Sequence, residues 1–273
     1  MRDSRHVELT TAGRALLEEA PQALAALERA AERTRLAGAG IAGTIRLGYT
    51  PATSAETLGS IVAAVEDDNP NMTIVASEVF SAQIPGRLLA GKVDVGIALL
   101  PETMRGVRSE PLRVEPLVLL VGKRHRLADA SVVPLASLEN ETLLLFPREL
   151  APAHYDRIIA ACEQAGFEPS VRAFPDPPLP AMLARLPAGR EVCFATASFA
   201  LSAAAGQPDI LAVEISPPGI LAEWSILWAE RSRSAAITRF LDSARQCAAE
   251  NSWLRSPTET SSAQIDAPSP APL

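Results

Sequence analysis

Apolar residues near the start of the chain recur at the spacing of a coiled-coil seam. Intervals of three and four residues separate the members of this stripe, which are Leu17, Ala20, Leu24, Leu27, Ala31 and Thr34. The stripe predicts a helix from about Thr11 to Leu36, with Pro21 marking a bend or a false start. A lone helix of this length is marginal in water, so the stripe should pack on its own domain or on a second chain. Glycines between positions 38 and 43 then predict a hinge, so we expect a linker and dimerisation helix with its hinge over residues 11–42.

From Gly43 the period changes to that of alternating strands and helices. Strands are expected at 44–49, 73–80, 93–99 and 117–121, with helices at 55–67 and 84–90. The theme then repeats, with strands at 142–146, 170–174, 192–196, 210–215 and 224–229 and helices at 154–165, 181–186 and 234–249. This order of elements favours a mostly parallel sheet covered by helices. Residues 254–273 are rich in Pro, Ser, Thr and Ala and are expected to be disordered.

Length and composition narrow the class of protein. A chain of 273 residues is expected to form two domains, and 48% hydrophobic with 21% charged residues is typical of a globular protein. A net charge of −7 is unlike the basic footprint of a nucleic-acid binder. Apolar runs such as 117–121 are too short to cross a membrane, and the polar start does not resemble a signal peptide. Three widely spaced cysteines fit a reducing compartment, so we expect a soluble cytoplasmic protein.

Motifs of catalysis and of cofactor binding are absent from the sequence. His6, His125 and His154 have no partner at the spacing of a metal site, and no nucleophile elbow, phosphate loop or dinucleotide loop occurs. Cys162 and Cys193 lie in apolar surroundings and are expected to be packing residues. We therefore expect no catalysis, no metal and no cofactor.

The turns that follow the expected strands carry hydroxyls and helix starts, which suit a small anionic or polar ligand. Two α/β lobes place such turns around a shared cleft. Each hydroxyl could instead cap a helix. Thr53 or Ser54, for example, is placed to cap the helix that begins at Ala55. Arg148 suggests a carboxylate on the ligand, although a surface arginine is more often only solvated. The ligand-binding candidates are Thr50, Thr53, Ser54, Ser81, Leu100, Phe146, Pro147, Arg148 and Ala197.

The N-terminal segment and the first strand resemble those of LysR-type transcriptional regulators. Residues 5–13, RHVELTTAG, resemble the end of that family's winged helix-turn-helix, where a wing strand leads through L-T-x-A-G into a linker helix. Residues 43–49 are similar to the first strand of the family's effector domain.

Further motifs follow in the family's order. Residues 69–73 with Glu78, and then residues 89–97, match the pattern P-x-v, E and L-x-x-G-x-x-D-x-g-i. Residues 125–128 resemble the H-P-L-A turn, with Arg126 in place of proline. Together these segments extend the resemblance over roughly residues 5 to 245.

The resemblance implies a two-lobe, periplasmic-binding-protein-like α/β domain of type 2 behind the linker helix. Lobe I is then expected at 43–115 with 224–250 and lobe II at 116–223, with crossings near 113–122 and 222–226. A small-molecule effector binds between such lobes, and the chains pair into dimers or tetramers. By position, the family's effector contacts fall on Thr50, Thr53, Ser54, Ser81, Phe146, Pro147 and Ala197.

One departure from the family concerns DNA. Residues 1–10 resemble only the final wing, with Arg2 and Arg5 as its phosphate contacts, so DNA is expected to bind only through a head that this chain lacks. Truncation, a misassigned start or a real loss each explain that lack. The expected function is a ligand-responsive LysR-type regulator. A stand-alone solute-binding protein of the same fold is the alternative, and a dehydratase-like enzyme on that fold is a third.

Overall fold

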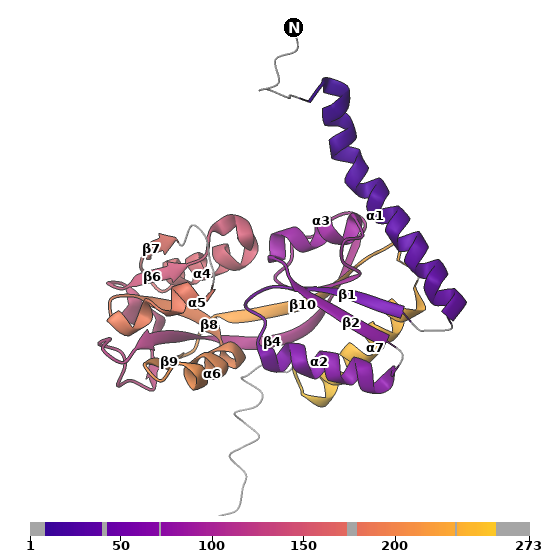
Figure 1. The fold of residues 1–273 in the computed structure, drawn as a ribbon. Helices are drawn as coiled ribbons and strands as arrows, with labels where there is room; N and C mark the ends of the chain where they lie inside the picture. The colour runs from indigo at the N-terminus through magenta and orange to yellow at the C-terminus, as the bar shows by residue number, and fades with distance from the viewer. Residues whose placement is uncertain (1–8, 40–42, 71, 174–178, 233, 255–273) are drawn as a thin grey trace, which may run out of the picture.

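A computed structural model describes residues 9–39, 43–70, 72–173, 179–232 and 234–254 (Figure 1). The predicted wing residues Arg2 and Arg5, the middle of the predicted hinge and almost all of the predicted tail lie outside these ranges. Within the described residues, no helix is long and apolar enough to cross a membrane.

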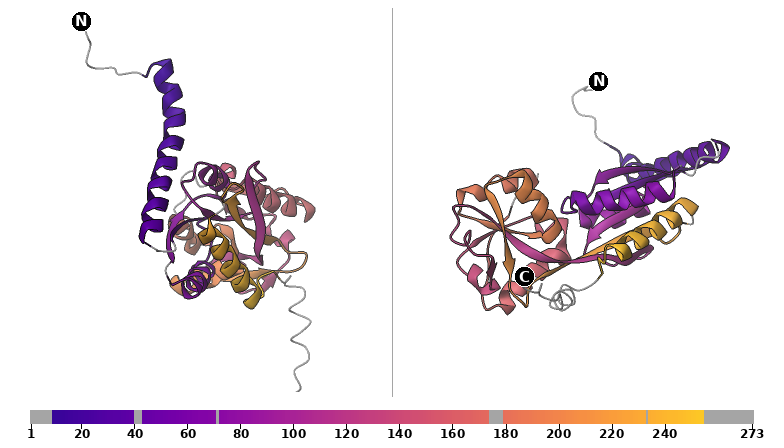
Figure 2. Two further views of the ribbon diagram at one scale, coloured as in Figure 1. Left: turned by 90° about the vertical axis from the view of Figure 1, so that its right-hand side faces the viewer. Right: turned by 90° about the horizontal axis from the view of Figure 1, so that it is seen from below.

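Helix α1 (Thr11–Ala39) continues through Pro21 without a break, and its N-terminal half stands clear of the rest of the molecule (Figures 1 and 2). Leu17, Leu24 and Leu27 of the predicted seam are 61%, 59% and 67% exposed. The seam therefore does not pack on its own domain. Farther along, Arg29 Nη1 donates to the carbonyl oxygens of Ala90 and Gly91 at 3.0 and 3.3 Å, which attaches α1 to the first lobe.

Lobe I contains the β-α-β-α-β order that the sequence predicts. Its elements are β1 (Gly43–Tyr49), α2 (Ala55–Asp68), β2 (Met72–Glu78), α3 (Ile84–Leu89) and β3 (Val95–Leu99). Strand β1 lies between β2 and β3 and is parallel to both, which brings the turns after these strands to one edge. Helix α7 (Ala235–Glu250) packs beside α2.

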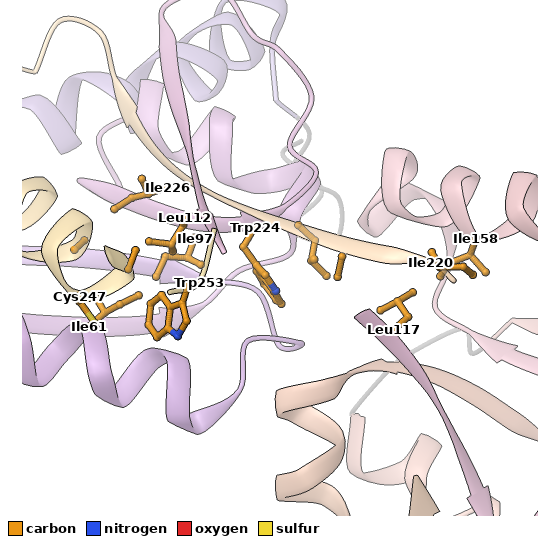
Figure 3. Packing of buried hydrophobic residues seen from close by; sticks show 14 of the residues in the cluster. Ile61, Ile97, Leu112, Leu117, Ile158, Ile220, Trp224, Ile226, Cys247 and Trp253 are labelled. Atoms are coloured by element: carbon orange, nitrogen blue, oxygen red, sulfur yellow. The ribbon is translucent and has the colours of Figure 1, made fainter. Parts of the chain in front are cut away.

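Two strands connect lobe I to lobe II. Strand β4 (Val107–Gly122) pairs with β10 (Leu221–Ala229) as far as Pro116, and from Leu117 onward it pairs with strands of lobe II. One hydrophobic core follows these strands from lobe to lobe. Figure 3 shows Leu117 and Ile220 near Ile158 of lobe II, and Trp224, Leu112 and Ile97 on the side of lobe I.

Lobe II repeats the alternation of strands and helices. Its elements are β5 (Val132–Val133), β6 (Thr142–Leu145), α4 (Pro152–Gln164), β7 (Ser170–Ala173), α5 (Leu179–Leu183), β8 (Val192–Thr196), α6 (Ala197–Gly206) and β9 (Ile210–Ile215). Strand β6 pairs in parallel with β7 and β8, whereas β4 is antiparallel to β8 and β9. The two-lobe α/β fold expected from the sequence is confirmed.

The structure adds two features that the sequence pattern does not predict. Helix α6 forms where only a turn was expected, because Thr196 caps it by accepting the Phe199 N–H at 3.4 Å. Strand β4 begins ten residues before the predicted start at Leu117. The unpredicted residues before Leu117 include Pro111, beside a register shift against β10, and Pro116. Proline is rare inside strands, so these residues did not suggest one.

Candidate functional site

A pocket with a volume of about 100 Å³ lies between the two lobes. Lobe I and the connecting strand β4 contribute Thr50, Pro51, Ala52, Phe80, Leu99, Leu117 and Leu120. Lobe II contributes Phe146, Leu150, Ala151, His154, Met182, Leu183, Cys193, Phe194, Ala195, Thr196 and Phe199. The walls therefore come from both lobes and from a strand that joins them.

The described residues that line this pocket are mostly apolar, and none of them is charged. Among these described residues are four phenylalanines, and only Thr50, His154 and Thr196 of them bring side-chain oxygen or nitrogen atoms. Burial raises the pKa of the lining Cys193 thiol to about 12, so this group is uncharged at neutral pH. The pocket thus suits a largely apolar small molecule that carries few polar groups.

The turn between β1 and α2 places its predicted hydroxyls in three different surroundings. Thr50 lines the pocket, and the Thr53 N–H donates to its carbonyl oxygen at 2.8 Å. Ser54 caps α2, because its Oγ accepts the Thr57 N–H at 3.1 Å. Thr53 Oγ1 is buried without a hydrogen-bond partner among the described residues, although Thr53 is outside the pocket lining.

Of the other predicted ligand-binding residues, some line the pocket and others do not. Phe146 lines the pocket, whereas Ser81 Oγ accepts the Leu99 N–H at 3.2 Å and holds the end of β3. Leu100 follows that strand with a φ of 39°, and Ala197 opens α6. Neither of these two, nor Pro147 at the start of a short turn, lines the pocket.

Arg148 lies on the surface and is paired within its own lobe. Its guanidinium donates to both oxygens of Asp156 at 2.7 and 2.6 Å, and these hydrogen bonds hold the pKa of Asp156 below its usual range. Arg148 is not part of the pocket lining. The structure therefore does not place it where the sequence suggested a pairing with a ligand carboxylate.

Several lining residues were not predicted from the sequence. Phe80 and Thr196, which line the pocket, directly precede the predicted Ser81 and Ala197, which do not. Met182 and Phe199 come from α5 and α6, which sequence periodicity describes poorly. Only the folded chain brings these residues to one cavity.

His154 is a buried histidine in the first turn of α4 and is 5% exposed. Its ring stacks on Phe146 with centroids 5.9 Å apart, and its Nδ1 has no hydrogen-bond partner among the described residues. Burial, with a contribution from the charge of Arg157, lowers the pKa of His154 to about 4, so the imidazole is neutral. By contrast, both ring nitrogens of His125 are hydrogen bonded, to Glu141 and to the Leu127 N–H.

Buried Glu115 connects the lobes at the crossing. Ser198 of α6 donates its backbone N–H and its hydroxyl to the carboxylate at 2.8 and 3.0 Å, and Trp224 Nε1 donates at 3.2 Å. Arg113 Nε lies 3.5 Å from the same carboxylate, and Arg113 Nη1 donates to Thr57 of α2 at 2.6 Å. A polar network therefore runs from the start of α2 in lobe I to the start of α6 in lobe II.

Known structures share this architecture. The crystal structure of CbnR, a LysR family transcriptional regulator, matches with a TM-score of 0.74 and 26% identity, over 89% of this chain and 83% of CbnR. The effector binding domain of BenM matches with a TM-score of 0.66 at 21% identity, over 80% of this chain and 97% of that domain. The predicted periplasmic-binding-protein-like fold class is confirmed.

Sequence comparison identifies the family. TfdS of Cupriavidus pinatubonensis, an HTH-type transcriptional regulator, is 29% identical over 245 residues, which cover 90% of this chain and 82% of TfdS. AlsR of Bacillus subtilis, another HTH-type transcriptional regulator, is 29% identical over 170 residues, which cover 62% of this chain and 56% of AlsR. The family model of the LysR substrate binding domain matches residues 38–249. The chain therefore belongs to the LysR family of transcriptional regulators.

Proposed function

We propose that a small-molecule effector binds in the interlobe pocket and regulates transcription by favouring one arrangement of the two lobes. The observation that carries this proposal is that both lobes contribute lining residues to the pocket. Thr50 and Phe80 come from lobe I, and Phe146 and Phe199 come from lobe II. A ligand in contact with both lobes binds one arrangement more tightly than another, and this difference in affinity shifts their populations. Strands β4 and β10 are the connections that such a shift would bend.

The proposal retains most of the sequence-based expectations. Lobe I comprises residues 43–115 with 224–250, and lobe II comprises residues 116–223. In this proposal the chain works by binding and not by catalysis, and it acts in the cytoplasm. DNA contact is assigned to a winged helix-turn-helix joined to the N-terminal end of α1, as the resemblance of residues 5–13 implies.

A transcription reporter tests this function. In cells that lack the chromosomal copy, we expect the full-length regulator to give a reporter signal that responds to its effector. Ala195→Leu fills the pocket from β8 and is expected to abolish that response without lowering the amount of protein. Ala205→Leu on the exposed side of α6 is the matched control and is expected to respond normally. An unchanged response from Ala195→Leu would remove the pocket from the mechanism.

The proposal includes dimerisation through α1. Leu24 and Leu27 belong to the predicted seam and are exposed, and a helix with an unpacked apolar stripe is stabilised by pairing with a second copy. Replacing both residues with glutamate places charges on that seam and is expected to convert a dimer or tetramer into smaller species. Sedimentation velocity measures the change, with Glu19→Ala on the same helix as the control.

A second interface is expected between α2 of one chain and α3 of its partner, as the family resemblance suggests. A chain that begins at Gly43 lacks α1 but retains both helices. We expect it to dimerise more weakly than the full chain and still detectably at tens of micromolar. A purely monomeric species at that concentration would eliminate this second interface and leave α1 as the site of pairing.

A further inference from the structure

The first turn of α4 combines two features at the wall of the pocket. Ala151 and His154 both line the pocket, and Ala151 occupies the N-cap position of α4 without a capping side chain. The first backbone N–H groups of a helix have no partner within the helix. Pro152 removes one of these donors, so the amides of Ala153 and His154 are the donors that the turn offers.

His154 supplies the second, independent observation. It is 5% exposed, it lines the pocket, and its Nδ1 is enclosed without a hydrogen-bond partner among the described residues. A buried polar atom without a partner destabilises a fold, so native proteins rarely retain one without a reason. The hydrogen-bonding capacity of this neutral imidazole is therefore not used by the chain itself.

The starts of α2 and α6, two other helices near the pocket, are already occupied. Ser54 accepts the free N–H of Thr57 in α2, and Thr196 accepts that of Phe199 in α6. The N–H of Ser198 donates to the carboxylate of Glu115, so α6 already holds a negative charge from within the chain. Among the described residues, no cationic side chain lines the pocket. An ionised carboxylate would therefore exchange its hydration for the first-turn amides of α4, with no charged side chain among the described lining residues to pair with.

From these observations we propose that the ligand is uncharged, with a flat apolar body and a hydroxyl group that the first turn of α4 binds through His154. This inference rests on the proposed function, because it concerns the effector of the same pocket. A hydroxyl both donates and accepts, so it can accept from a backbone N–H and donate to a neutral imidazole. The phenylalanines around the cavity provide surfaces for the flat body. His154 is then a specificity-determining residue.

Three fluorinated probes of similar shape test the inference by fluorine NMR titration of the full chain at neutral pH. Fluorobenzene has no hydrogen-bonding group, meta-fluorophenol carries an uncharged hydroxyl, and meta-fluorobenzoate carries a carboxylate. We expect meta-fluorophenol to bind about tenfold more tightly than either of the others. Equal or tighter binding of meta-fluorobenzoate, or binding of none of the probes at millimolar concentration, would overturn the inference.

Variants of His154 separate recognition from folding. His154→Leu is expected to reduce the preference for meta-fluorophenol over fluorobenzene to within about twofold, while His154→Gln keeps most of it. Because Leu removes an unpartnered polar group, the melting temperature should not fall, whereas His125→Leu breaks two hydrogen bonds and should lower it. A retained preference in a folded His154→Leu protein, or a melting temperature lowered as far as in His125→Leu, would contradict the assigned role.

Two further variants locate the binding. Ala195→Leu should remove binding of every probe, and Arg148→Ala should change none, because Arg148 is paired with Asp156 outside the lining. If the probes bind to Ala195→Leu as they do to the unmodified chain, the pocket itself is wrong and the proposed function fails with it. If Ala195→Leu removes binding but the carboxylate probe is preferred, only the inference about the hydroxyl fails.

Discussion

Replacing Glu115 with alanine is expected to lower the free energy of unfolding by about 3 kcal/mol. The carboxylate is buried and accepts three hydrogen bonds, two from Ser198 and one from Trp224, beside the guanidinium of Arg113. Alanine leaves those donors and that charge without an acceptor at the place where the lobes meet. Urea unfolding monitored by tryptophan fluorescence measures the loss, because Trp224 lies within the network.

Glu110 provides the matched control on the same strand. Its carboxylate accepts two hydrogen bonds of 2.9 Å from Arg245, but this pair lies near the surface of lobe I. Glu110→Ala is expected to cost less than about 1 kcal/mol. Glu115→Gln should fall between the two, because its amide oxygen still accepts but its charge is gone. Equal losses for Glu110→Ala and Glu115→Ala would show that the network does not hold the lobes together.

Gly122→Ala is expected to destabilise the chain by about 2–3 kcal/mol. A Cβ atom at this position would lie 2.0 Å from the carbonyl oxygen of Leu186 and 2.8 Å from Pro187 Cα. Both atoms belong to the backbone of a short turn packed on the end of β4, so relief requires the turn to move. That turn follows α5, which supplies Met182 and Leu183 to the pocket, so ligand binding should weaken as well.

Gly59→Ala is the control of opposite sign. Gly59 is exposed within α2, and a Cβ atom there meets nothing within 4 Å. Alanine in a helix interior is favoured over glycine by about 0.5–1 kcal/mol, so this variant should melt at a higher temperature than the unmodified chain. If differential scanning calorimetry shows Gly122→Ala melting as high as the unmodified chain, the close approach of β4 and this turn is incorrect.

How well each helix or strand could be predicted depended on how regularly apolar residues recur along it. The sequence predicted a helix at 55–67, and α2 spans Ala55–Asp68, because apolar residues there recur at the helical period on one face. It predicted a strand at 192–196, and β8 spans these residues. Helix α6 was not predicted because it consists mostly of alanine and serine, which give no contrast between an apolar and a polar face. Local sequence therefore predicts helices and strands that have one apolar, buried face and one polar, exposed face.

The pocket was harder to predict than the elements around it. Strand ends identify the turns, and Thr50 and Phe146 of the predicted ligand contacts line the pocket. A hydroxyl in a turn, however, has two uses, and Ser54 and Ser81 accept backbone N–H groups of their own lobe. The combination of His154 and Phe199 arises from packing between helices distant in sequence, which no local pattern encodes.

The most direct test of the account is a thermal-shift screen of small molecules against the unmodified chain and two variants that each replace one alanine with leucine. A ligand that binds only the folded state raises the melting temperature. The account predicts compounds that stabilise the unmodified chain and Ala205→Leu but leave Ala195→Leu unchanged, because only Ala195 lines the interlobe pocket. Compounds whose stabilising effect is equally large on Ala195→Leu would contradict the central claim that the effector binds between the lobes.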